Sequence, residues 1–307
     1  MADLEKKKVV VLGGTGFVGS GVLRALAAYP LSELLWMKRA EAVSPLAVGL
    51  SQPKIIEDLE AVELSWFRDA DVIIDLVSRG RGRMVSQRDI NLRIRPHLRI
   101  IDGLINSGSK AHYILLSSGG AIYGNTSSRM LSESSPCLPN TEYGLEKAII
   151  ELHLLAAAQT TLKTSILRVT NAYGVGQPTK PGFGVIPALV NALETGEAFP
   201  IFGSGEMQRD YINVIDVVGA VEAAIRHGGV GVTNIGTGCG TSINELVSLV
   251  QELSGRKVNA EYIETNDSDP NFAQLSISRA RELLKWGPTV RLRDGLSRIL
   301  DEKKLLR

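Results

Sequence analysis

The sequence predicts an α/β fold in which helices cover both faces of a doubly wound parallel sheet. Short apolar runs rich in β-branched residues alternate with helical patterns as far as about residue 171. The early runs carry almost no polar residues at alternate positions, which is typical of strands buried on both faces. Because strands that alternate with helices build βαβ units, the sheet that they form is parallel.

The predicted strands are short apolar runs over residues 9–12, 34–37, 72–76, 113–116 and 164–167. Strong helical patterns follow over 17–28 and 143–158. Proline and glycine punctuation after about residue 171 predicts a smaller, partly interleaved C-terminal region. We expect a larger part over residues 1–171, with a return at about 214–240, and a smaller part over about 172–213 and 241–307.

The composition is that of an ordinary globular protein. Of the 307 residues, 44% are hydrophobic and 22% are charged, and the formal net charge is +1. These values argue against disorder, and they give no overall attraction to nucleic acid or anionic membranes. No apolar stretch approaches the roughly 18 residues of a membrane span, and the stretch near the N-terminus is shorter than a signal-peptide core. We expect a cytoplasmic protein that binds neither nucleic acid nor membrane.

The cysteines and histidines show neither a disulfide pattern nor a metal-binding pattern. Cys137 and Cys239 lie far apart in the sequence and belong to no CxxC motif. The histidines have no ligand spacing and are interpreted as structural or surface residues; they are His97, His112, His153 and His227. We therefore expect no disulfide framework and no metal.

A glycine-rich loop, GGTGFVG at 13–19, follows the first predicted strand and opens the first predicted helix. Its G-x-x-G-x-x-G spacing allows a tight turn and lets the backbone approach a pyrophosphate, which then meets free N–H groups at the helix N-terminus. The flanking strand and helix make this a specific signal for dinucleotide binding. We therefore predict a Rossmann-type fold whose loop contacts the cofactor through Gly13, Thr15, Gly16, Phe17, Val18 and Gly19.

The end of the second strand indicates which dinucleotide is bound. An Asp or Glu about 20 residues after the loop would bind the adenosine ribose hydroxyls, but Lys38 and Arg39 stand here. Two cations can pair with a 2′-phosphate, so NADP is expected in preference to NAD. A solvated basic strand end is the alternative. Asp58, beside Leu59, is either an acceptor for the adenine amino group or an exposed loop residue.

A basic block between residues 79 and 99 has a single acid, Asp89, and its arginines are Arg79, Arg81, Arg83, Arg88, Arg93, Arg95 and Arg99. Arginine-glycine segments bind single-stranded nucleic acid, but this block has no aromatic residue to stack on bases. A second interpretation is that Arg79 or Arg81 holds cofactor phosphates. We favour the third, a solvated basic loop and helix face.

A tyrosine and a lysine, Tyr143 and Lys147, lie four residues apart at the head of the predicted helix over 143–158. This spacing places them on one helix face. A phenol with a pKa near 10 is a poor base at neutral pH unless a nearby cation stabilises the phenolate. Ser117 and Ser118 end the strand at 113–116, where a hydroxyl can meet a substrate oxygen beside the tyrosine. The sequence thus predicts an acid–base site at the carboxyl edge of the sheet.

Taken together, these motifs resemble the extended short-chain dehydrogenase/reductase superfamily, in its NAD-dependent epimerase/dehydratase branch. The resemblance covers nearly the whole chain and rests on seven segments in order: GGTGFVG at 13–19, SSGGAIYG at 117–124, YGLEK at 143–147, RVTNAYG at 168–174, GSGEMQRDYINVID at 203–216, NIGTG at 234–238 and LLKWGP at 283–288. YxxxK alone occurs often by chance, but the ordered set is highly specific.

The resemblance implies roles for particular residues. Tyr143 would handle the proton of a sugar hydroxyl while hydride passes between that carbon and a nicotinamide, and Lys147 would also bind the nicotinamide ribose. Asn171 and Arg209 would face the diphosphate of a nucleotide-sugar substrate, with Arg209 pairing its phosphates. Ser118 is expected to contact the substrate. Further residues expected to border the cofactor are Leu59, Leu76, Val77 and Ser78.

Three departures from the family pattern bear on the substrate. Gly119 stands where Ser or Thr is usual, so either Ser118 reaches the substrate or the enzyme works without that hydroxyl. Gly120 and Ala121 replace the Asp-Glu pair of 4,6-dehydratases, which argues against a dehydratase. A second phosphate-binding arginine is usual in the stretch that here reads TNDSD at 265–269.

We expect oxidation and reduction at a sugar carbon of a nucleotide-diphosphate sugar, with C4 as the favoured carbon. A 4-epimerase is the leading interpretation. The first alternative is an NADPH-dependent reductase of a nucleotide 4-keto-6-deoxy sugar, which Lys38 and Arg39 favour. An alternative of another class is a non-catalytic, cofactor-binding regulatory protein. The helix over 143–158 is apolar nearly all round, and because dimers of the family pair this helix, the resemblance implies a homodimer.

Overall fold

The computed structural model describes residues 4–42, 50–78, 87–124, 130–179, 184–264 and 274–307, with the side chains of residues 87–89 excepted. A sheet of seven parallel strands forms its larger part, in the order β12-β7-β5-β4-β1-β2-β3. This order, which runs outward in both directions from the first strand, confirms the predicted doubly wound sheet. Within the described residues, no helix is both long enough and apolar enough to cross a membrane.

The strands of this sheet extend four of the predicted apolar runs by one to three residues, stop one residue short of the end of the predicted run over 72–76, and add two strands at the edges. They are β1 (Lys8–Leu12), β2 (Glu33–Arg39), β3 (Lys54–Ile56), β4 (Val72–Asp75), β5 (His112–Ser118), β7 (Lys163–Val169) and β12 (Gly231–Ile235). In the centre, Val10 of β1 lies opposite Leu35 of β2 and Ile73 of β4. The buried central strands explain why the apolar runs lack polar alternation.

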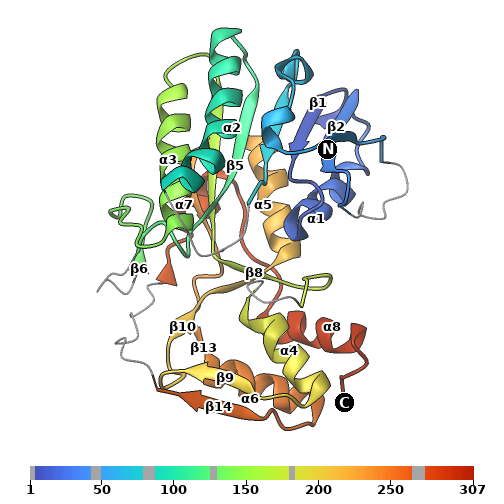
Figure 1. The fold of residues 1–307 in the computed structure, drawn as a ribbon, viewed down its shortest axis with the longest axis vertical. Coiled ribbons are helices and arrows are strands. Elements are labelled where there is room, and N and C mark those ends of the chain that lie inside the picture. Colours follow the sequence, from blue (N-terminus) through green and yellow to red (C-terminus); the bar gives the residue numbers. More distant parts are fainter. Residues whose placement is uncertain (1–3, 43–49, 79–86, 125–129, 180–183, 265–273) are drawn as a thin grey trace.

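Helices cover both faces of the sheet (Figure 1). α1 (Phe17–Leu26) and α5 (Val214–His227) pack on one face, and α2 (Gln87–Asn106) and α3 (Glu142–Ala157) pack on the other. Side chains of a strand point alternately to the two faces, so Val9 and Val11 join the core under α1 and α5. Val10 and Leu12 join the core under α2 and α3.

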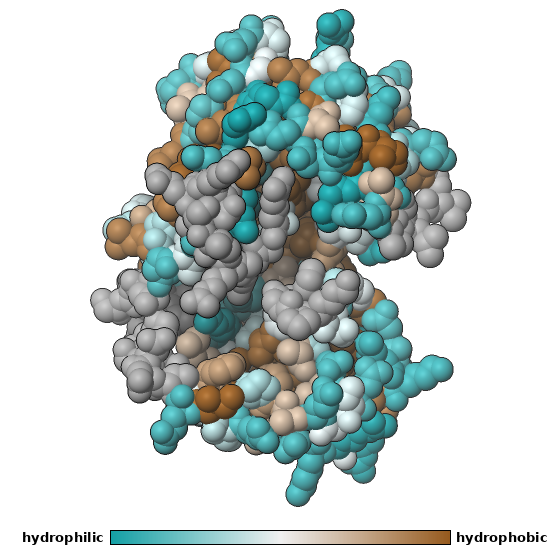
Figure 2. Space-filling model, viewed as in Figure 1, coloured by the Kyte–Doolittle hydropathy of each residue, from teal (hydrophilic) through white to brown (hydrophobic). Residues whose placement is uncertain are grey.

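The smaller part has a core of its own and lies below the sheet in Figure 1. It consists of α4 (Val185–Thr195), β9 (Phe199–Phe202), α6 (Ile243–Ser254), β14 (Ala260–Ile263) and α8 (Leu292–Glu302), with β9 and β14 paired in parallel. Figure 2 shows the surface hollowed between the larger and the smaller part. The exact division of the chain into a cofactor-binding and a substrate-binding part stays a prediction.

Short elements connect the two parts. The paired ones are β6 (Met130–Leu131) with β15 (Gln274–Leu275), β8 (Asn171–Tyr173) with β11 (Tyr211–Asn213), and β10 (Gln208–Arg209) with β13 (Thr241–Ser242). Three other short elements pack against the larger part: α7 (Ser278–Leu283) and the 3₁₀ turns η2 (Leu59–Ala61) and η3 (Leu64–Phe67). Because β8 directly follows β7 and pairs with β11, which directly precedes α5, this pair lies where the sheet meets the smaller part.

Candidate active site

The loop after β1 has the backbone geometry of an anion-binding turn. Gly13 adopts φ +77°, and the Gly16 N–H donates to the Gly13 carbonyl at 3.1 Å. A Cβ on Gly13 would lie 2.8 Å from the Leu76 carbonyl carbon, and one on Gly19 would overlap the Gly13 carbonyl oxygen. Gly16 caps α1 without a side-chain hydrogen bond. The N–H groups of the first helical turn therefore stay available to a phosphate, and the loop fits a dinucleotide pyrophosphate.

Lys38, Arg39 and Asp58 are expected to bind the adenosine end of the cofactor, and each contacts a residue two to four positions further along the chain. The Lys38 ammonium donates to the Ala42 carbonyl at 2.8 Å, and the Arg39 guanidinium lies 3.3 Å from the Glu41 carboxylate. One oxygen of Asp58 caps η2 by accepting from the Glu60 N–H at 2.8 Å. Leu59 is buried under this turn. Parallel pairing of β2 with β3 brings the Arg39 and Asp58 segments to the same sheet edge.

Tyr143 and Lys147 lie on the first turns of α3, as their spacing predicts. Thr141 caps the helix by accepting from the Gly144 N–H at 3.1 Å. Lys147 is 1% exposed, and its ammonium donates to the Val77 carbonyl at 3.0 Å. The same ammonium lies 6.0 Å from the centroid of the Tyr143 ring. Since Val77 follows β4, α3 is held with its reactive side chains at the carboxyl edge of the sheet.

A buried segment over 117–124 borders Tyr143 and is fixed by polar contacts. The Tyr123 hydroxyl donates to the Asn234 side-chain oxygen at 2.6 Å and accepts from Arg168 at 3.0 Å. Arg168 in turn binds both carboxylate oxygens of Glu151 on α3. Ser118 is buried, and within the described residues its hydroxyl makes no hydrogen bond. Its expected contact with a substrate stays a prediction.

Gly119 has a packing reason to be glycine. A Cβ at this position would lie 2.9 Å from the Arg168 carbonyl oxygen and would overlap the side chain of Leu275. Leu275 is fully buried and comes from β15, far along the chain. The place of the usual family hydroxyl is therefore closed by Leu275 and by the end of β7.

The β8–β11 pair brings Asn171 next to Asp210, the residue that follows Arg209. Asn171 lies opposite Tyr211, and its side-chain amide donates to the Asp210 carbonyl at 2.9 Å. The Asp210 carboxylate accepts from the Thr237 and Gly238 N–H groups, both at 3.0 Å, which fixes the strand that carries Arg209. A Cβ on Gly120 would lie 3.9 Å from the Asn171 side-chain oxygen, so Asn171 borders the segment over 117–124. The contact of Asn171 and Arg209 with a substrate diphosphate stays a prediction.

The basic block divides into two groups. Arg79, Arg81 and Arg83, together with the stretch 265–269, lie outside the described residues. Within α2, Arg93 lies 3.6 Å from Glu146, Arg95 lies 3.1 Å from Glu60, and Arg99 donates to the carbonyls of Glu60 and Val62. Arg95 is largely exposed, as a solvated helix face predicts, but the side chains of Arg93 and Arg99 are partly buried by these contacts.

The sequence interpretation missed a buried polar cluster under the site. Asp75 ends β4 and is 0% exposed, and its carboxylate lies 2.6 Å from His97 and accepts from the Tyr113 hydroxyl at 2.7 Å. Burial raises the pKa of Asp75, but His97 and the Lys147 ammonium outweigh burial and lower it to about 2. His97 was interpreted only as a structural or surface histidine. The one local signal in the sequence is an acid within an otherwise apolar run.

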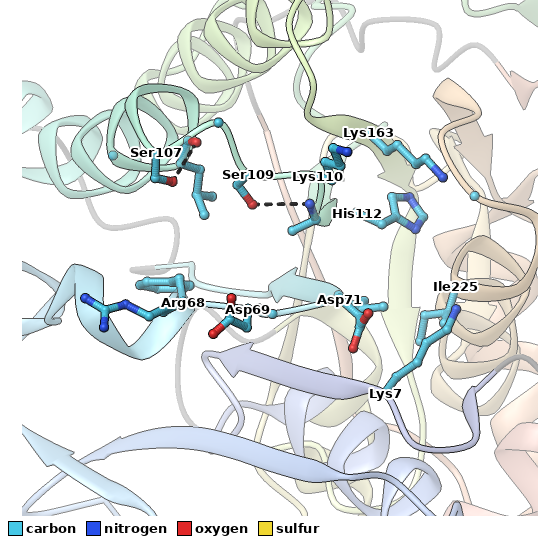
Figure 3. Close-up of a pocket in the computed structure, with 18 of the residues that line it drawn as sticks. Lys7, Arg68, Asp69, Asp71, Ser107, Ser109, Lys110, His112, Lys163 and Ile225 are labelled. Atoms are coloured by element: carbon cyan, nitrogen blue, oxygen red, sulfur yellow. Dashed lines mark hydrogen bonds between the residues drawn. The ribbon is translucent and has the colours of Figure 1, made fainter.

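A second hollow, of about 860 Å³, opens at the opposite edge of the sheet. Figure 3 shows Lys7, Asp71, Lys110 and Lys163 around it, beside the amino ends of β1, β4, β5 and β7. Burial, with Lys163 and Lys7, lowers the pKa of His112 in its wall to about 4. In open α/β sheets ligands bind outside the carboxyl ends of the strands, so the candidate site is the edge that carries Tyr143. Among the described residues, no cluster of three or more acidic, histidine or cysteine side chains could hold a metal ion.

Known proteins of related sequence and structure point to one family. The UDP-glucose 4-epimerase of Azospirillum brasilense is 31% identical over 324 residues, which cover 95% of this chain and 90% of that protein. The dTDP-4-dehydro-6-deoxyglucose reductase of Escherichia coli is 27% identical over 320 residues, or 97% and 98% of the two chains. The crystal structure of UDP-glucose 4-epimerase with UDP-glucose from Thermotoga maritima matches with a TM-score of 0.86 at 29% identity, over 97% of this chain and 98% of that one.

The model of the NAD dependent epimerase/dehydratase family matches residues 9–236, a span that includes the glycine loop, the Tyr143–Lys147 pair and Arg209. More than half of the chain is covered, and the resemblance that the motifs carry is confirmed. The chain belongs to the NAD dependent epimerase/dehydratase family.

Proposed function

We propose that the protein is a nucleotide-diphosphate-sugar 4-epimerase with a bound nicotinamide dinucleotide. The observation that carries this proposal is the Tyr143–Lys147 pair beside the glycine loop at one sheet edge. The similarity to UDP-glucose 4-epimerases over nearly the whole chain supports it.

The residues present fit the cofactor. The glycine loop and the free N–H groups of α1 would hold its pyrophosphate, and Lys147 would hold the nicotinamide ribose. Bound there, the nicotinamide supplies the hydride acceptor and donor. Tyr143 takes the proton of the C4 hydroxyl as the C4–H bond gives up hydride, which leaves a 4-keto sugar. Tyr143 would return the proton to the oxygen when C4 is reduced on its other face, which would give the C4 epimer with no net oxidation.

The test is to incubate the purified protein with UDP-glucose or UDP-galactose and to follow their interconversion by chromatography. An epimerase interconverts them with no net change in cofactor. The similarity to the E. coli reductase favours a second candidate, reduction of a nucleotide 4-keto-6-deoxy sugar. That activity consumes one NADPH per sugar, so a parallel incubation with a nucleotide 4-keto-6-deoxy sugar and NADPH distinguishes the two. A protein that binds cofactor but performs neither reaction would contradict both candidates.

We further propose that Lys38 and Arg39 favour NADP over NAD. Their side chains lie at the end of β2, and Arg39 is exposed, so its guanidinium can leave Glu41 for a 2′-phosphate at little cost. We expect Arg39→Gln to weaken NADP binding about tenfold, because a charge-assisted contact is lost, and to leave NAD binding nearly unchanged. Titration of the protein with each nucleotide measures this. Equal weakening of both nucleotides, or an unaltered protein that prefers NAD, would contradict the proposal.

We also propose a homodimer formed through α2 and α3. The outer faces of these helices expose large apolar side chains beside each other: Leu92 is 47% exposed, Leu145 40% and Leu152 67%. The two helices pack together in one layer, so these leucines can form one apolar patch. We expect light scattering at micromolar concentration to give twice the mass of the chain, and Leu152→Glu to reduce it to the single mass. A monomeric unaltered protein would contradict the dimer.

A further inference from the structure

A fully buried carboxylate, Asp75, lies beneath Lys147, and the reaction described above does not use it. It stands at the end of β4, at the sheet edge where the reactive side chains gather. One of its oxygens receives both the Tyr113 hydroxyl, at 2.7 Å, and the His97 ring nitrogen, at 2.6 Å. His97 and Tyr113 are themselves buried. Three elements, β4, β5 and α2, are thus joined at a single carboxylate oxygen.

The second oxygen of Asp75 is connected to Lys147 through the backbone of Val77. It accepts from the Val77 N–H at 3.1 Å, which fixes the orientation of the backbone around Val77. The carbonyl of Val77 accepts the Lys147 ammonium at 3.0 Å. The ammonium is then 6.0 Å from the Tyr143 ring centroid. A continuous set of contacts therefore runs from His97 through Asp75 and Val77 to the Lys147–Tyr143 pair.

The buried charges of Lys147 and Asp75 also indicate that these two residues interact. Among the ion pairs of the described residues, none includes Lys147, although its ammonium is buried. The charged and titratable groups that act on Asp75 are His97 on α2, Tyr113 on β5 and Lys147 on α3. The same two helices also carry Arg93, on α2, and Glu146, on α3. Arg93 and Glu146 lie 3.6 Å apart and offset each other. Because a buried charge requires a counter-charge, Asp75 is the carboxylate available to Lys147.

We propose that Asp75, held by His97 and Tyr113, is a positioning residue that orients Lys147 through the Val77 peptide and supplies its counter-charge. Removing its charge is therefore expected to change the electrostatic effect of Lys147 on Tyr143. Asp75 does not touch the substrate or the cofactor, since it has no exposed surface. The relevance of this device to turnover rests on the proposed function, but the device itself can be tested without a sugar substrate.

The test replaces Asp75 by Asn, which keeps the shape and removes the charge. Ultraviolet absorbance follows phenolate formation as the pH is raised, and the difference between Asp75→Asn and Asp75→Asn/Tyr143→Phe isolates Tyr143. Without the carboxylate, the Lys147 ammonium acts unopposed on the phenolate. We expect the midpoint to move to lower pH, because a negative charge that opposes the ammonium has been removed. An unchanged midpoint would overturn the proposal.

Asp216→Asn is the matched control. Asp216 is also a buried aspartate, on α5, and it accepts from the Thr289 N–H and hydroxyl and from the Val290 N–H. The same chemical change there breaks a comparable set of hydrogen bonds away from Lys147. We expect it to leave the Tyr143 midpoint in place. If both variants shift the midpoint alike, general loosening explains the shift and the proposal fails.

If Asp75→Asn does not fold, a second variant tests the proposed role of Asp75. The proposal attributes such a failure to a stranded Lys147 ammonium, so adding Lys147→Met should restore folding, as judged by circular dichroism. A double variant that stays as unfolded as the single one would overturn the proposal. Neither readout depends on a sugar. Absence of turnover in the unaltered protein, with the titration shift intact, would therefore reject the proposed function and leave the role of Asp75 standing.

Discussion

Tyr143→Phe is expected to lower the rate of sugar interconversion by about two to four orders of magnitude, the usual contribution of a positioned acid–base group. The substitution removes one oxygen, and within the described residues the Tyr143 hydroxyl makes no hydrogen bond whose loss would unsettle the fold. Lys147 keeps its contact with Val77. The measurement is the initial rate with saturating UDP-glucose, alongside the affinity for the cofactor, which should change little.

Tyr29→Phe serves as the control for the same chemical change. The Tyr29 hydroxyl donates to Glu222 at 2.8 Å, in a contact between the chain after α1 and α5 that involves none of the candidate site residues. We expect this variant to keep full activity. A Tyr143→Phe protein with the unaltered rate would show that another group moves the proton, and the proposed mechanism would be wrong.

Features that depend on short stretches of sequence could be predicted. The glycine loop follows from a turn that needs a positive φ at Gly13 and has no room for a Cβ at Gly19, and the i, i+4 spacing of Tyr143 and Lys147 follows from the helix repeat. The parallel sheet follows from apolar runs that lack alternation. Each of these patterns has its physical cause within a few residues of itself, so one sequence is enough to read it.

Features made by distant segments could not be predicted. The Asp75 cluster combines residues of β4, α2 and β5, and no local spacing relates His97 or Tyr113 to Asp75. Gly119 could be noticed as a departure from the family pattern, but its cause is Leu275, which arrives from β15. The helix over 143–158 reads as apolar nearly all round, yet only the structure shows that Leu152 is on the exposed face.

The ion pair between Glu151 and Arg168 is expected to be the most costly polar contact to break. Glu151 is 2% exposed and Arg168 4%, and the guanidinium donates to both carboxylate oxygens at 2.7 to 3.2 Å. Glu151→Gln leaves a buried guanidinium without its counter-charge. We expect the free energy of unfolding to fall by about 3 to 5 kcal/mol, which a urea titration would show as a lower midpoint with an unchanged slope.

Glu252→Gln is the matched control, because the chain contains the same kind of pair on its surface. Glu252 binds Arg293 through two hydrogen bonds of 2.7 and 3.0 Å, but both side chains are exposed, so water replaces the lost contact. We expect little or no change in its unfolding midpoint. Arg168→Met added to Glu151→Gln should recover part of the loss, because it removes the stranded charge. If the buried and the surface substitution lowered the unfolding midpoint equally, burial would not make the Glu151–Arg168 pair more costly to break.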